Sequence, residues 1–160
     1  MRDEVETNRA IERYGDTVRR LCIIHLKNEA DTQDIFQTVF LKYLLHDQPF
    51  DSEEHEKAWL IRVTLNACKD LLKSFFRSRT VPLEELTTQA ADLTDERREV
   101  LSAVLELPQK ERDVVYLHYY EGYTAPEIGG LLGKNVNTIY THLARARERL
   151  RERLGGEVHG

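Results

Sequence analysis

The feature that most constrains this chain is segment 122–154, where two helical patterns meet across a short break. The first pattern begins with Pro126 in its first turn, where a missing amide donor costs nothing, and Gly133 follows its end, where a left-handed backbone suits glycine. Asn135 is a suitable N-cap for the second pattern. The apolar residues of that pattern recur at spacings of three and four: Val136, Ile139, Leu143, Ala146, Leu150 and Leu154. Small Gly129 permits a close approach of the two helices. Together these features predict a helix-turn-helix, whose second helix lies in the DNA major groove.

The face of this second helix opposite the apolar stripe is basic. Between residues 134 and 153, six Lys/Arg stand against two Glu, a local balance of +4. The early turns of a groove-inserted helix contact base edges, and arginines further along contact phosphates. Solvated pairs such as Arg145 with Glu148 are the alternative explanation of these charges. The residues expected to contact DNA are Lys134, Asn135, Asn137, Thr138, Tyr140, Thr141, His142, Arg145, Arg147 and Arg149.

The formal net charge of −5 would argue against nucleic-acid binding if the charge were spread evenly. It is not spread evenly. The balance is −5 over residues 1–60 and −5 over residues 83–113, but +4 over residues 61–79. Two basic segments separated by acidic stretches predict two nucleic-acid contacts, with acidic surfaces left for other partners.

Cys22 and Cys68 lie far apart and have no CxxC spacing or clustered histidines. Reduced thiols are therefore expected rather than a zinc site. No apolar run is long enough to cross a bilayer, and the N-terminus has no apolar targeting segment. The expected protein is cytoplasmic, without membrane insertion, metal or cofactor.

The remaining apolar spacing predicts only helices, so the fold class is all-α, with two small helical domains and a flexible linker. A turn-rich loop over 47–52 holds an isolated Phe50. Pro82 and a Thr-rich, acidic composition mark the linker. The predicted helices before the helix-turn-helix are 8–27, 31–45 (capped by Asp31), 53–76, 95–106 and 109–120; in the last two, apolar positions such as Val100 and Val114 would line the core. The predicted domain map is 1–77 for the first domain, 78–94 for the linker, 95–154 for the helix-turn-helix domain and 155–160 for the tail.

Three parts of the chain resemble bacterial RNA polymerase sigma factors. Residues 107–150 resemble the C-terminal DNA-binding region, with shared Leu107-Pro108, Glu121-Gly122 and Arg145-Ala146-Arg147. DTQDIFQTVFLKYL (31–44) resembles the helix that docks on the polymerase, and AWLIRVTLNACKDLLKS (58–74) resembles the promoter-melting helix. Only the compact two-domain members, the extracytoplasmic-function sigma factors, are this short.

The resemblance implies a promoter-specificity subunit, not an enzyme and without catalytic residues, that directs core RNA polymerase to promoters and helps open them. The implied partners are core RNA polymerase, promoter DNA and an anti-sigma factor. The helix-turn-helix would contact the upstream element. The polymerase contacts implied are Asp34, Ile35, Gln37, Thr38, Phe40 and Leu41. The downstream-element contacts implied are Phe50, Asp51, Arg62, Asn66, Lys69, Lys73 and Arg77.

The chain departs from the family pattern at several positions. Thr38 replaces a usual glutamate, and Tyr140 and His142 stand where basic residues are common, which predicts a different upstream element because tyrosine cannot clamp guanine as arginine does. Gly129 stands where the family often has alanine, one small residue for another.

Three alternatives bear on the same sequence. Phe50 could fold back onto the helices instead of contacting a base, and Trp59 is expected to be a core anchor. A free-standing helix-turn-helix regulator with a dimerising or ligand-binding half would explain the C-terminal motif but not the basic segment 61–79. A helical metallohydrolase is suggested only by scattered histidines that lack a metal-ligand spacing.

Overall fold

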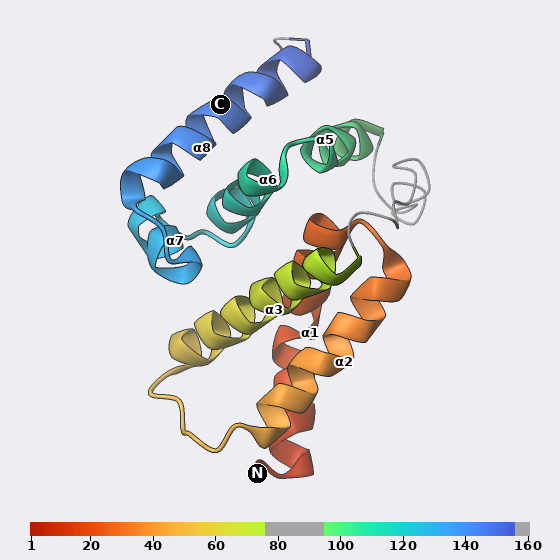
Figure 1. Cartoon of the computed structure of the whole chain (residues 1–160), viewed down its shortest axis with the longest axis vertical. Coiled ribbons are helices and arrows are strands. Elements are labelled where there is room, and N and C mark those ends of the chain that lie inside the picture. The colour runs from red at the N-terminus through yellow and green to blue at the C-terminus, as the bar shows by residue number, and fades with distance from the viewer. Residues whose placement is uncertain (76–94, 156–160) are drawn as a thin grey trace. The chain divides into compact units, whose positions relative to one another are not determined.

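The computed structural model describes residues 1–75 and 95–155, and every regular element within those ranges is helical (Figure 1). The chain divides into two compact units, Met1–Thr80 and Val81–Gly160. The predicted all-α class with two helical units is confirmed. Arg77 and the predicted linker 78–94 lie outside the described residues, as does all but the first residue of the predicted tail, so the predicted domain map stays a prediction.

The first unit consists of α1 (Glu4–Leu26), α2 (Glu29–Leu45) and α3 (Glu53–Phe75), which pack against one another. Helix α1 begins four residues earlier than predicted because the Asp3 carboxylate caps it by accepting from the Glu6 amide at 2.7 Å. It ends at Lys27, whose φ of 56° turns the chain. Asn28, not Asp31, caps α2, with its side-chain oxygen 3.0 Å from the Asp31 amide.

Aromatic and aliphatic side chains from all three helices form one core in this unit. Val18, Val39 and Cys68 are fully buried, and Trp59 packs against the core while remaining partly exposed. Helix α3 is held to α2 by the Tyr43 hydroxyl, which donates to Glu56 at 2.6 Å. Burial and this carboxylate raise the pKa of Tyr43 far above its usual value. Both cysteines are free and buried.

The second unit consists of α5 (Asp95–Leu105), α6 (Gln109–Val115), α7 (Ala125–Leu132) and α8 (Val136–Arg153). The predicted helix 109–120 is continuous only to Val115, after which Tyr116–Tyr120 form a π-helical turn. The core includes fully buried Val114. Val100, predicted to line the core, is 44% exposed on α5.

Candidate nucleic-acid and polymerase interfaces

The turn between α7 and α8 has the geometry that the sequence predicts. The Thr124 hydroxyl accepts from the Glu127 amide, and the Glu127 carboxylate accepts from the Thr124 amide at 2.9 Å, which completes a capping box. These bonds lower the pKa of Glu127. Gly133 ends α7 with a φ of 66°, and Asn135 caps α8. The helix-turn-helix is therefore closed at both helix ends by local hydrogen bonds.

The apolar stripe of α8 is buried as expected, with Ile139, Leu143 and Ala146 at 2% exposure or less. The opposite side is open to solvent. Tyr140 is 54% exposed there. Other predicted DNA-contacting residues with exposed side chains are Lys134, Asn135, Asn137, Thr141, Arg145, Arg147 and Arg149. An exposed face with this composition can lie against a DNA groove.

Two of the predicted phosphate contacts are engaged within the second unit. Arg147 donates through Nε to the Tyr119 hydroxyl and lies over the Tyr119 ring. Arg149 forms an ion pair with buried Glu111 at 3.0 Å. Both guanidinium groups therefore have structural partners that the sequence pattern did not reveal, because the partners precede α8 by about ten helical turns of chain.

Lys134 and Arg145 differ from these two arginines. Both are exposed, and within the described ranges neither side chain makes a hydrogen bond or an ion pair. The surface pair of Arg145 with Glu148, considered from the sequence, does not form. Arg145 projects from the middle of α8 with its fork of donors free, as direct contact with a base edge requires.

The polar residues at the start of α8 are partly used by the helix itself. The Asn135 side-chain oxygen accepts from the Asn137 amide at 2.8 Å, and the Thr141 hydroxyl donates to the Asn137 carbonyl at 3.0 Å. Thr138 and His142 are half-buried. Burial, together with nearby Lys110 and Lys134, lowers the pKa of His142, so this side chain is neutral at pH 7.

A second basic face lies on α3. Arg62, Asn66, Lys69 and Lys73 follow one another at spacings of four, three and four residues, so they share one side of the helix. All four are exposed, and within the described part of the chain none of them has a hydrogen bond or ion pair. The opposite side of α3, with Leu60 and Ile61, is buried. Unpaired cations in a row can follow a phosphate backbone.

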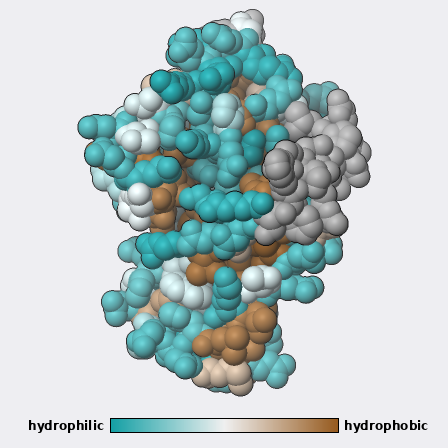
Figure 2. All heavy atoms as spheres, in the orientation of Figure 1, coloured by the Kyte–Doolittle hydropathy of each residue, from teal (hydrophilic) through white to brown (hydrophobic). Residues whose placement is uncertain are grey.

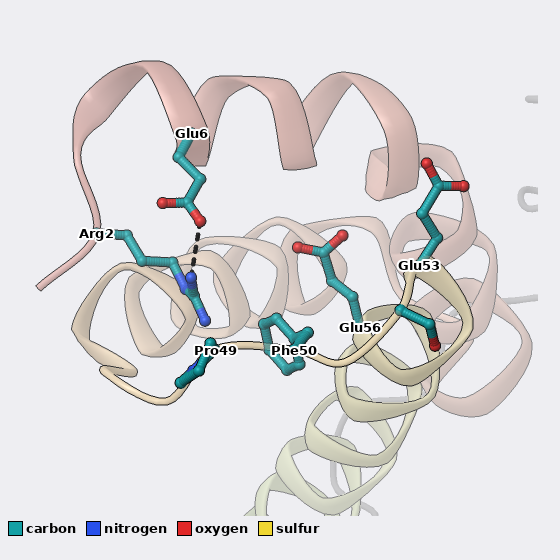
Figure 3. A pocket seen from close by; sticks show the side chains of 7 residues that line it. Arg2, Glu6, Pro49, Phe50, Glu53 and Glu56 are labelled. Atoms are coloured by element: carbon teal, nitrogen blue, oxygen red, sulfur yellow. Dashed lines mark hydrogen bonds and ion pairs between the residues drawn. The ribbon is translucent and has the colours of Figure 1, made fainter.

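Phe50 lies in the loop between α2 and α3 and is half-buried in an aromatic group rather than isolated (Figure 3). Its ring stacks on Tyr43 and His46, with centroid distances of 6.1 and 5.4 Å. Its neighbour Asp51 is exposed, and the Asp51 amide donates to the His55 ring at 3.1 Å. The fold-back of Phe50, one of the two predicted alternatives, is thus the arrangement observed.

The predicted polymerase-binding set on α2 is only partly available to a partner. Ile35 and Phe40 are 6% and 4% exposed and belong to the core of the first unit, so their assignment as surface contacts is wrong. Asp34, Gln37 and Leu41 are exposed on one side of α2. The Thr38 hydroxyl, half-buried, donates to the backbone carbonyl of Asp34 at 3.0 Å.

Two residues that the sequence argument missed belong to these surfaces. Figure 2 shows a mostly polar surface interrupted by apolar side chains, and on α2 both Leu41 and Leu45 are more than half exposed. Leu45 follows Leu41 by four residues, a spacing that could have revealed it. Arg2 contacts the Phe50 loop, and no local pattern signals that contact because the two segments are 46 residues apart.

Comparison with protein families agrees with this geometry. Residues 10–79 match the model of sigma-70 region 2, and residues 97–150 match the model of sigma-70 region 4. The two matches together span most of the chain, one in each helical unit. The chain belongs to the sigma-70 family of transcription initiation factors.

Individual relatives narrow the assignment. The chain is 26% identical over 161 residues to the ECF RNA polymerase sigma factor SigW of Bacillus subtilis, covering 90% of this chain and 86% of the relative. It is 27% identical over 156 residues to the ECF sigma factor SigM of Mycobacterium tuberculosis, covering 96% and 79%. The chain is thus an extracytoplasmic-function sigma factor, which directs RNA polymerase to promoters for transcription initiation.

Solved structures share the fold. The sigma factor RpoE of Bartonella quintana, solved with the anti-sigma factor NepR, matches with a TM-score of 0.74 at 16% identity, covering 96% of this chain and 99% of that one. CnrH, solved with the cytosolic domain of CnrY, matches with a TM-score of 0.68 at 25% identity, covering 98% and 92%. Within the described ranges of this chain, no helix combines the length and apolar character needed to cross a membrane.

Proposed function

We propose that this sigma factor divides promoter recognition between two helix faces, one in each unit. The exposed face of α8 reads the upstream element, with Arg145 and Tyr140 at base edges and Lys134 at a phosphate. The exposed face of α3, with Arg62, Asn66, Lys69 and Lys73, holds the downstream strand as it opens. The observation that carries this proposal is that both faces expose basic side chains without partners among the described residues.

Strand opening costs a few kcal/mol for each base that leaves the stack, by analogy with enzymes that flip bases. A row of cations and an aromatic surface can offset that cost by holding the released strand. Helix α3 supplies the cations, and the loop after α2 supplies Phe50 with exposed Asp51 beside it. Arg77, assigned to this interface from the resemblance, lies outside the described residues.

The proposal places core RNA polymerase on the exposed side of α2, through Asp34, Gln37, Thr38 and Leu41. It assigns no catalytic residue to the chain, because polymerase performs the chemistry, and it places the chain in the cytoplasm with that enzyme. An anti-sigma factor is the other proposed partner. This follows from the family resemblance and is consistent with the protein complex in which CnrH was solved.

The polymerase contact is tested by the pair of substitutions Gln37→Ala and Leu41→Ala. Both side chains are exposed, so the variant should fold normally and lose core-polymerase binding in a pull-down. A matched control is Gln33→Ala with Lys42→Ala, two exposed positions of the same helix that lie outside the proposed contact set. Binding of the first variant at wild-type strength removes the assignment of this surface.

A further inference from the structure

Arg2 is the most deeply buried arginine side chain at the surface of the first unit for which an ion pair is resolved, with 9% of its side chain exposed. Its backbone amide donates to the Leu44 carbonyl at 2.8 Å, which fixes the segment before α1 against the end of α2. From this anchor the side chain extends toward the loop between α2 and α3 (Figure 3). Its position is therefore set by the backbone as well as by the guanidinium group.

The guanidinium group of Arg2 makes contacts of three kinds. One terminal nitrogen pairs with Glu6 at 2.7 Å, and the other donates to the Gln48 carbonyl of the loop at 2.6 Å. The plane of the group lies over the rings of Tyr43 and Phe50, with the central carbon 4.8 and 4.7 Å from the centroids. Only a planar, forked cation satisfies a carboxylate, a carbonyl and two rings at once.

These contacts converge on the loop residue that the proposed function uses for strand opening. Phe50 has Tyr43 and His46 as its stacking partners, and Arg2 adds a cation to the same ring. Beside the ring lies a cavity of about 390 Å³, whose lining includes Arg2, Glu6, Phe50 and Glu56 (Figure 3). Arg2 therefore fixes both the backbone of the loop, at Gln48, and the aromatic wall of this cavity.

We propose that Arg2 is a positioning residue for promoter opening, acting through Phe50. This inference rests on the proposed function, in which the loop after α2 contacts the downstream strand. Arg2 holds the loop and the Phe50 ring in one orientation before DNA arrives, so that the strand meets a preformed surface and ordering the loop costs nothing at that moment.

One feature argues that this arrangement is more than a device for stability. The Nε of Arg2 is buried and has no hydrogen-bond partner in the described part of the chain. A buried donor without a partner weakens a fold, so an arginine selected for stability alone would be expected to satisfy it.

The test is a double-mutant cycle of Arg2→Ala and Phe50→Ala, measured as the rate of strand opening by the complete polymerase complex on a duplex promoter. Fluorescence of 2-aminopurine in the downstream element reports the opening. Each single variant should lose about tenfold, the size expected for a residue coupled to its contact partner. Because Arg2 acts through Phe50, the double variant should lose no more than Phe50→Ala alone. Losses that multiply would overturn the proposal.

Two further variants separate geometry and stability from positioning. Arg2→Lys keeps the charge but lacks the planar fork, so it should open promoters as poorly as Arg2→Ala; full activity of Arg2→Lys would overturn the proposal. The matched control is Arg13→Ala, which removes another arginine–glutamate pair, with Glu53 at 2.7 Å, and should open promoters normally. An equal loss in Arg13→Ala would show a general effect of surface ion pairs and would also overturn it.

The outcomes also distinguish failure of this inference from failure of the proposed function. If Phe50→Ala opens promoters at the wild-type rate, the role of the loop fails and Arg2 fails with it. If Phe50→Ala is defective but Arg2→Ala is normal, only the role of Arg2 fails. Thermal melting of each variant checks folding, and Arg2→Gln replaces Arg2→Ala in the cycle if the alanine variant does not fold.

Discussion

A Cβ atom added to Gly129 would lie 2.8 Å from the backbone carbonyl oxygen of Lys134, closer than real Cβ contacts allow. The Lys134 amide also donates to the Gly129 carbonyl at 2.9 Å, so the two backbones are held together across the turn of the helix-turn-helix. Gly129 is therefore not interchangeable with the alanine common in the family. The expectation of one small residue for another is corrected by this contact.

Gly129→Ala should consequently destabilise the chain by about 1–3 kcal/mol, the usual cost of overpacking, despite the better helix propensity of alanine. The neighbouring Gly130 is the matched control, because a Cβ there would meet nothing within 4 Å. Gly130→Ala should stabilise the chain by about 0.5–1 kcal/mol. Denaturant unfolding measures both, and equal stabilities of the two variants would contradict the close contact.

Arg149→Ala should destabilise the second unit by about 1–2 kcal/mol, less than for a fully buried pair because Arg149 is half exposed. The physical reason is that Glu111, whose side chain is 7% exposed, would lose its cation at 3.0 Å. Arg151→Ala is the control, since Arg151 is exposed on the same helix and has no ion pair within the described ranges. Thermal melting that shifts equally for both variants would show that the Glu111 contact contributes nothing.

Acidification should weaken the fold through His142. Its pKa is lowered in the folded chain by burial and by Lys110, Lys134 and Arg145, so the unfolded chain binds the proton more readily. Stability is therefore full above the unfolded pKa of about 6.5 and falls as the pH drops toward the folded value. His142→Gln should reduce the difference in unfolding free energy between about pH 7.5 and 5.5. An unchanged difference would contradict this origin.

Base reading by Arg145 is separable from phosphate contact by Lys134. Arg145→Ala should cost about 1–3 kcal/mol on the cognate upstream element and relax preference at one base pair. Lys134→Ala should instead weaken every sequence similarly and lower the salt slope by about one unit. Binding to single-base variants at two salt concentrations distinguishes them, and equal losses of Arg145→Ala on all sequences would exclude base reading.

The helix-turn-helix was predictable because its signals are local. Pro126, Gly133 and Asn135 act within a few residues of where they stand, and the structure places each of them as expected. The early start of α1 at Asp3 also has a local signal, a capping aspartate, which competed with weaker apolar spacing in the first turns.

The rest depended on contacts between distant segments. Arg149 pairs with Glu111, and Arg2 reaches Gln48, across spans that no periodicity encodes. The burial of Phe40 was missed because α2 is apolar on more than one side, so spacing alone could not separate the core face from the exposed one. Sequence therefore indicated the interfaces but overestimated how many of their residues are free to bind.

The most direct test of the two-face account is transcription of fragmented genomic DNA by core RNA polymerase, with the 5′ ends of the transcripts sequenced. With this chain, transcripts should start at discrete sites that share an upstream and a downstream element, and core polymerase alone should produce no such sites. Lys69→Ala with Lys73→Ala should yield fewer transcripts from the same sites, whereas Arg145→Ala should alter the shared upstream element. Identical 5′ ends with and without the chain would contradict the account.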